Sequence, residues 1–236
     1  MSMKILALDT SSRYLCLGLI NGRNFYEYRI DTGVALSRVL VPAIERVLAA
    51  AGMSVADIEY YAAGLGPGSF TALRIGHAAV KALAWANRRP VIGIPTLEIL
   101  AAHPGIPDGL VIPVVDAKRS LVYCGWYVKS AGGIRRAAPD RLLSFDRFIS
   151  GLSKIKSAHK GKRIIIGGDG LNVCADRIKA AFPEAALLEK DFWYPQSQTL
   201  ISLSLRQIHA RKLTNAFELE PIYLYPQECQ IKTARK

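Results

Sequence analysis

The chain has 236 residues, of which 50% are hydrophobic, and a mean hydropathy of +0.17. This length and composition favour one large or two small folded domains and argue against a disordered tail. No uninterrupted apolar run reaches the roughly 20 residues of a membrane-spanning helix, and the apolar run before Asp9 is too short for a signal peptide. With four widely spaced cysteines that form no CxxC pair, these features predict a cytoplasmic protein with buried thiols and no membrane partner.

The formal net charge is +12, from 31 Lys and Arg against 19 Asp and Glu, and the basic excess is concentrated after residue 103. Residues 154–163 are rich in Lys and Arg, and the chain ends in a second basic segment at residues 232–236. Such segments attract phosphate backbones through counterion release. Each segment alone is more simply a solvated loop or tail. Together they give weak support for a nucleic-acid neighbour.

In chain order, the first predicted element is a buried strand at residues 4–9, an apolar run that ends in the carboxylate of Asp9. Thr10 and Ser11 follow as a hydroxyl turn, and an Asn-Gly pair after residue 20 predicts a hairpin. Pro42 lies inside a helical pattern, so the helix must kink there or begin close to it. The remaining first-half patterns predict strands at residues 14–20, 24–30, 58–63 and 90–94 and helices at residues 36–51, 73–85 and 96–102.

A glycine-rich turn at residues 64–69 joins a predicted strand to a predicted helix, and Ser69 is placed to cap that helix. Unpaired N–H groups at a helix start favour an anion or the acceptor atoms of a partner. However, no GK[ST] sequence follows, the third glycine of a dinucleotide fingerprint is missing, and Pro67 removes one N–H group. We therefore expect a rigid turn that shapes a protein-binding surface.

After a linker at residues 103–109 the pattern restarts, with an apolar strand at residues 112–116 that ends in Asp116. Laying Asp9 on Asp116 also lays Gly18 on Gly125, which predicts an internal duplication, although two β-meanders can look alike by chance. Further predicted elements are strands at residues 122–127 and 163–166, helices at residues 172–182 and 198–213, and a Gly-Gly-Asp-Gly turn at residues 167–170. The predicted domains are residues 1–102, residues 103–226 with the 198–213 helix packing back on the first domain, and a basic tail at residues 227–236.

Local signals for catalysis are poor. The four histidines never fall at i, i+4 with a second ligand, there is no GxSxG motif, and Ser69 has no evident histidine–acid partner. Asp9 and Asp116 fit a magnesium–phosphate group between two domains, but strand-tip acids often bind only nearby turn N–H groups. The sequence therefore predicts no catalytic residue, no metal and no resident cofactor, and it leaves weak ATP or ADP binding open.

Five motifs carry a resemblance to a known family: LALDTSS at residues 6–12, GPGSFTALRIG at residues 66–76, VVDAKR at residues 114–119, GDG at residues 168–170 and PIYL at residues 221–224. Together they resemble the TsaB (YeaZ) family of bacterial tRNA threonylcarbamoyladenosine biosynthesis proteins, over about residues 4–226. The resemblance implies the α/β fold of actin, sugar kinases and heat-shock ATPases: two duplicated actin-like ATPase-type domains, each a mixed sheet with flanking helices.

The resemblance implies a non-catalytic scaffold that binds a TsaD-type subunit and supports threonylcarbamoylation of N6 of adenosine 37 in tRNAs reading ANN codons. The chain lacks the HxxxH metal motif of TsaD. The resemblance also implies that a TsaE-type ATPase joins through the complex, that tRNA is contacted indirectly, and that the chain forms a homodimer when TsaD is absent. The docking helices map to residues 36–51 and 69–87, although an apolar helix stripe is more often core than interface. The implied interface residues are Leu36, Leu40, Ile44, Gly66, Ser69, Phe70, Leu73, Arg74 and His77.

Two further sets of residues complete the prediction. A vestigial nucleotide cleft is expected at Asp9, Thr10, Ser11, Asp116, Gly168 and Asp169, and Lys154, Lys156, Lys160 and Lys162 are expected near tRNA in the assembled complex. The main alternative is an active ATP-dependent transferase or kinase that uses this cleft, and a peptidase ranks last. The chain departs from the family at Leu36, Ala72 and Tyr225, where relatives usually carry His, Gly and Arg.

Overall fold

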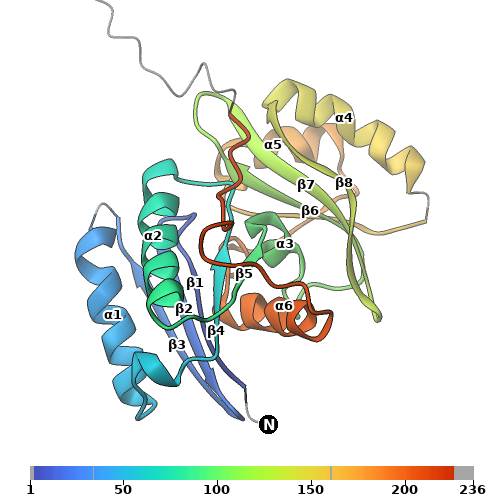
Figure 1. The fold of residues 1–236 in the computed structure, drawn as a ribbon. Helices are drawn as coiled ribbons and strands as arrows, with labels where there is room; N and C mark the ends of the chain where they lie inside the picture. Colours follow the sequence, from blue (N-terminus) through green and yellow to red (C-terminus); the bar gives the residue numbers. More distant parts are fainter. Residues whose placement is uncertain (1–2, 34, 160, 226–236) are drawn as a thin grey trace, which may run out of the picture.

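The computed structural model describes residues 3–33, 35–159 and 161–225, apart from the side chain of Lys156. It contains two α/β halves that lie side by side (Figure 1). In the first half the elements are β1 (Lys4–Asp9), β2 (Tyr14–Asn21), β3 (Asn24–Asp31), α1 (Leu36–Ala50), β4 (Tyr60–Gly64), α2 (Phe70–Ala86), β5 (Val91–Ile94) and α3 (Thr96–Ala101). In the second half they are β6 (Gly109–Asp116), β7 (Leu121–Ser130), β8 (Gly133–Ser144), α4 (Phe145–Ala158), β9 (Ile164–Gly167), α5 (Leu171–Ala181), β10 (Ala186–Leu187) and α6 (Ser197–His209).

Both halves repeat one topology. The strand order is β3-β2-β1-β4-β5 in the first sheet and β8-β7-β6-β9-β10 in the second. In each sheet the first strand pairs antiparallel with the second and parallel with the fourth. The predicted fold class is therefore confirmed: two duplicated actin-like domains, each a mixed sheet with flanking helices. The duplication that the Asp9–Asp116 alignment predicted is confirmed with it.

The first sheet buries both faces of its inner strands β1, β2 and β4, which are buried at successive positions, whereas the edge strand β3 is largely exposed. Leu6 and Leu8 of β1 point toward α1 and α2, where they join one hydrophobic cluster. Ile5 and Ala7 point to the opposite face and pack with α6, which belongs to the second half of the chain. The sheet is thus a central layer between two helical layers.

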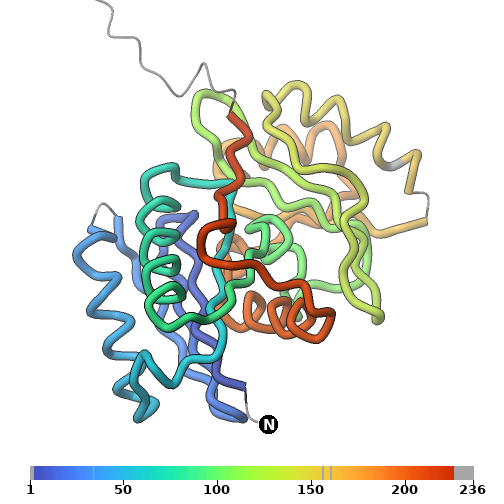
Figure 2. Tube along the Cα trace, in the orientation of Figure 1, coloured from blue at the N-terminus to red at the C-terminus, as the bar shows by residue number. Residues whose placement is uncertain are grey.

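The second sheet is covered in the same way. Leu110 and Ile112 of β6 pack with α4 and α5, whereas Val111 packs with Leu97 and Leu100 of α3. Helix α3 therefore covers the second sheet and α6 covers the first, so the last helix of each half packs on the sheet of the other half. Figure 2 shows the segment after α6, in red, running between the two halves.

Several sequence expectations need correction. Helix α1 begins at Leu36, as its predicted range indicated, and it continues through the exposed Pro42, so the alternative of a helix that begins close to this proline is wrong. Strand β8 and helix α4 were not predicted, and α4 contains Lys154, which therefore lies on a helix and not in a loop. Ser69 does cap α2, accepting from Ala72 N at 3.5 Å.

Two smaller findings concern composition. Within the described ranges, no helix is both long and apolar enough to cross a membrane. Cys16, Cys124 and Cys174 are free and buried, as the spacing of the cysteines predicted, and Cys229 lies outside the described residues. The predicted domain boundaries stay predictions. The basic tail at residues 227–236 also stays a prediction, because it lies outside the described residues.

Candidate functional site

The first strand tip, formed by Asp9, Thr10 and Ser11, is fully buried. Asp9 Oδ1 accepts hydrogen bonds from Ser11 N at 2.7 Å and from Ser11 Oγ at 2.6 Å. Asp9 Oδ2 accepts from Thr96 Oγ1 at 2.7 Å, and that hydroxyl in turn accepts from Gly66 N at 3.0 Å. Because both carboxylate oxygens have donors and the side chain is 0% exposed, Asp9 has no free face for a ligand.

The glycine-rich turn seals this tip from outside. Ser69 N donates to Ser11 O at 2.8 Å, and Thr10 Oγ1 donates to Ala72 O at 2.8 Å. A Cβ atom built on Gly68 would lie 2.3 Å from Ser11 O, and one on Gly64 would lie 1.8 Å from Asp9 Oδ2. Glycine is needed at these positions because the turn and the strand tip approach at backbone distance.

His77 holds the same turn from inside α2. Its Nε2–H donates to Gly64 O at 3.0 Å, a tautomer set by the carbonyl acceptor, while its Nδ1 has no partner among the described atoms. Burial lowers the pKa of His77 below its usual value, and the neighbouring Gly64 carbonyl only partly offsets this. The ring is therefore neutral at pH 7, and its hydrogen bond to Gly64 O joins α2 to the end of β4.

The second strand tip, formed by Asp116, Gly168 and Asp169, is more open. Asp116 Oδ1 accepts from Lys118 N at 2.8 Å, and Asp116 Oδ2 pairs with Lys118 Nζ at 2.7 Å, with 16% of the Asp116 side chain exposed. Asp116 N donates to Asp169 Oδ1 at 3.0 Å, and burial raises the pKa of Asp169. A Cβ atom on Gly168, at φ +121°, would lie 2.3 Å from Val114 O, so this turn also requires glycine.

A C-terminal strap, residues 221–225, crosses from one half to the other. Ile222 N donates to Leu65 O at 2.8 Å in the first half, and Tyr225 Oη donates to Ala117 O at 2.8 Å in the second. The Tyr223 ring lies 5.1 Å from Phe70, and the strap closes a cavity of about 270 Å³ beside Arg119. The sequence identified residues 221–224 as one of the motifs that carry the family resemblance, but it did not predict that they join the two halves.

The predicted interface residues divide into two groups. Leu36, Leu40, Ile44, Gly66, Leu73 and His77 are buried within this chain. An amphipathic helix turns its apolar stripe toward its own sheet, and the role of these buried side chains as contact residues stays a prediction. Ser69, Phe70 and Arg74 are exposed and stay predictions as contact residues.

The outward side of α2 carries Arg74, Ala78 and Ala82, which we call the α2 outer face. These residues recur at intervals of four, so they lie on one side of the helix. On neighbouring α1, Val41 and Glu45 are also exposed. Small side chains along an exposed helix allow another backbone to approach closely.

Of the lysines predicted to lie near tRNA, Lys154 is exposed beside a cavity of about 690 Å³ between β8 and α4, where Arg141 and Arg147 are its basic neighbours. Lys162 is exposed just before β9. Lys160 and the side chain of Lys156 lie outside the described residues. Across the described part of the chain, no group of three or more His, Cys, Asp or Glu side chains could hold a metal ion.

The repeated mixed sheets, each with an aspartate at the end of its first strand, define a protein of the actin-like fold. A family model described as "TsaD: tRNA N6-adenosine threonylcarbamoyltransferase" matches residues 32–228. The chain therefore belongs to this TsaD family, and several proteins to which it is similar are named TsaB or YeaZ.

Three relatives define the extent of the similarity. The chain is 35% identical over 140 residues to the tRNA threonylcarbamoyladenosine biosynthesis protein TsaB of Bacillus subtilis (strain 168), over 59% of this chain and 61% of that protein. It is 26% identical over 227 residues to TsaB of Haemophilus influenzae, over 94% of each chain. The solved structure of YeaZ from Pseudomonas aeruginosa matches with a TM-score of 0.83 and 26% identity, covering 95% of this chain and 100% of that one.

Proposed function

We propose that this chain is a non-catalytic scaffold subunit that binds a TsaD-type transferase subunit and supports threonylcarbamoylation of N6 of adenosine 37 in tRNAs reading ANN codons. The observation that carries the proposal is the sealed first strand tip, where both carboxylate oxygens of Asp9 accept hydrogen bonds from Ser11 and Thr96. A fold of this class without a free strand-tip carboxylate in its first half is suited to binding a partner and poorly suited to phosphate chemistry. The names of the TsaB relatives supply the pathway.

The docking surface in this proposal is the α2 outer face together with Val41 of α1. Arg74, Ala78 and Ala82 are exposed, whereas the apolar stripes of both helices are already buried in the first sheet. A partner helix could pack closely against the alanines, and Arg74 offers a charge for orientation. A TsaE-type ATPase would join through the same assembly, and the α2 outer face would pair two copies of the chain when the TsaD-type subunit is absent.

Size-exclusion chromatography of this chain with a TsaD-type subunit, with and without nucleotide, tests the proposal. We expect co-elution, and we expect Ala78→Arg to abolish it because a long charged side chain would hold the helices apart. The matched control is Ala180→Arg, at an exposed alanine on α5, the helix that corresponds to α2 in the second half. Failure of the unmodified proteins to co-elute, or equal loss in both variants, would overturn the proposal.

The second candidate is an ATP-dependent transferase or kinase, and one observation favours it. Asp116 and Asp169 lie next to each other at the more open second strand tip, and carboxylates of this kind can bind Mg²⁺ with a nucleotide phosphate. Titration calorimetry with ATP–Mg²⁺ at millimolar concentration decides between the candidates. Absence of heat would eliminate the enzyme, and heat that disappears in Asp169→Asn would favour it.

A further inference from the structure

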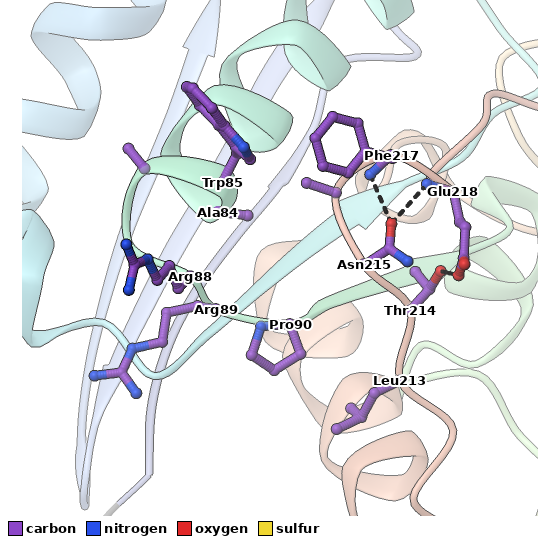
Figure 3. A pocket seen from close by; sticks show the side chains of 12 residues that line it. Ala84, Trp85, Arg88, Arg89, Pro90, Leu213, Thr214, Asn215, Phe217 and Glu218 are labelled. Carbon is purple, nitrogen blue, oxygen red and sulfur yellow. Dashed lines mark hydrogen bonds between the residues drawn. The ribbon is translucent and has the colours of Figure 1, made fainter.

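A groove of about 860 Å³ lies at the end of the first half farthest along α2, outside the strand tips and the α2 outer face. One wall is the last turn of α2, with Trp85 followed by Arg88 and Arg89. The other wall is the loop after α6, with Leu213 and Phe217. Figure 3 shows the Trp85 indole and the Phe217 ring on opposite sides of this groove.

The two aromatic rings are unusually exposed for their size. Phe217 is 74% exposed and Trp85 is 65% exposed, the largest values among the exposed large hydrophobic side chains of the described residues. Such rings are costly to leave in water, and aromatic side chains on opposite walls offer flat apolar faces to a flat ligand. Their coincidence in one groove points to a planar occupant.

The loop that carries Phe217 is held in place. Thr214 pairs with Val91 of β5 through two backbone hydrogen bonds, at 2.9 and 3.0 Å, so the loop continues the edge of the first sheet. Phe217 N and Glu218 N both donate to Asn215 Oδ1, at 2.9 and 3.1 Å, as the dashed lines in Figure 3 mark. The ring is therefore presented from a fixed turn, which lowers the entropy lost when it binds a ligand.

The rim of the groove is positively charged. Arg88 and Arg89 end one wall, and Arg211 and Lys212 come immediately before Leu213 on the other; all four are exposed and none forms an ion pair with a described residue. The single acid that lines the groove, Glu218, accepts a hydrogen bond from Thr214 Oγ1 at 2.8 Å. The C-terminal residues beyond 225 are themselves basic, so they do not complement this rim. An anionic occupant does.

We propose that this groove binds an unpaired segment of RNA, with bases stacked on Trp85 and Phe217 and phosphates paired with Arg88 and Arg89. Planar bases with an anionic backbone match both features of the groove, and aromatic stacking with arginine contacts is how proteins hold single strands. An acidic peptide would satisfy the charge but would leave the two ring faces without a flat partner. Within the proposed function this RNA would be tRNA, whereas the assignment of an RNA-binding groove does not rest on the proposed function.

The test measures binding of a fluorescently labelled, unstructured 12-nucleotide RNA to the chain alone, by anisotropy at low salt. We expect Arg89→Ala/Phe217→Ala to weaken binding about tenfold or more, and to lower the salt slope by about 1. The matched control is Arg23→Ala/Phe25→Ala, which removes an exposed arginine and an exposed phenylalanine from the β2–β3 hairpin. Equal weakening in both variants would reduce the effect to net charge and overturn the proposal.

Two single variants separate stacking from general apolar contact. Phe217→Tyr keeps the ring face and should retain RNA affinity, whereas Phe217→Leu keeps the apolar bulk and should lose most of the effect. Equal affinity of these two variants would contradict stacking.

Co-elution with the TsaD-type subunit distinguishes failure of this proposal from failure of the proposed function. We expect Arg89→Ala/Phe217→Ala to co-elute as the unmodified chain does. Lost co-elution with unchanged RNA affinity would identify the groove as a protein-docking surface and overturn the RNA assignment.

Discussion

The two strand tips occupy equivalent places in a duplicated fold, yet their environments differ. Asp9 is 0% exposed and satisfied entirely by Ser11 and Thr96, whereas 16% of the Asp116 side chain is exposed and its partner Lys118 reaches into solvent. The difference comes from what covers each tip. The glycine-rich turn before α2 lies against Thr10 and Ser11 at backbone distance, while the turn before α5 leaves Asp116 partly open.

This contrast shows that a repeated topology fixes where a carboxylate is placed, but not whether it can bind. In the first half the carboxylate stabilises the turn that supports α2, the helix that carries the proposed docking face. In the second half Lys118, Arg119 and Ser120 adopt left-handed backbone conformations next to Asp116, so the open tip is also the more strained one.

The greatest loss of stability is expected from adding one methyl group at the last residue of β4, and a smaller loss from the same change at the last residue of β9. Gly64→Ala would place a Cβ atom 1.8 Å from Asp9 Oδ2, within a buried hydrogen-bonded carboxylate, and we expect unfolding free energy to fall by about 3 kcal/mol or more. Gly167→Ala would meet Leu188 Cδ1 at 2.5 Å, the end of a side chain that can rotate, and we expect a loss of about 1 kcal/mol. Urea denaturation measures both, and equal losses would contradict the contrast between the tips.

A smaller effect is expected from neutralising the two strand-tip acids. Asp9→Asn would turn an amide N–H₂ toward the buried donors Ser11 or Thr96, which should cost about 1–3 kcal/mol. Asp116→Asn affects an exposed pair with Lys118, and we expect a change within about 0.5 kcal/mol. Chemical denaturation at pH 7 checks both values. A larger loss for Asp116→Asn would mean that the second tip is the better sealed of the two.

The smallest expected effect is a pH dependence that belongs to the first tip. Burial lowers the pKa of His77 in the folded chain, so the unfolded chain binds more protons as the pH falls through the usual histidine range. The stabilisation is complete above the unfolded pKa of about 6.5 and declines as the pH falls below it. His77→Gln keeps a donor for Gly64 O, and we expect its stability to vary less than that of the unmodified chain between pH 8 and pH 5.5.

His103 provides the control for that experiment. Burial also lowers its pKa, but it lies at the start of the linker, where it contacts Gln196 and not the first tip. His103→Gln should therefore leave the His77 contribution intact. Thermal melts of both variants over the same pH range make the comparison, and a His77→Gln profile parallel to that of the unmodified chain would argue against a neutral, buried His77.

Much of the fold was predictable because it depends on local patterns. Asp9 at the end of an apolar run, the Asn-Gly hairpin and the Ser69 cap each depend on residues close together in sequence. Strand β8 and helix α4 were not predicted because their local patterns are weak. Pro139 lies inside β8, whose pairing with β7 is irregular around Trp126. Helix α4 mixes apolar residues with Lys and Ser. The stripe of Leu36, Leu40 and Ile44 showed that one side of α1 is covered, but not by what.

The two strand-tip carboxylates, the glycine turns and the duplication could be predicted from the sequence, because spacing along the chain specifies them. Tertiary structure alone decided three further features: the bonding of Asp9 to Thr96, the strap from Leu65 to Ala117, and the groove between Trp85 and Phe217. Each joins residues that are far apart in the chain. Periodicity reports which face of an element is buried, whereas the partner that buries it depends on how the elements pack.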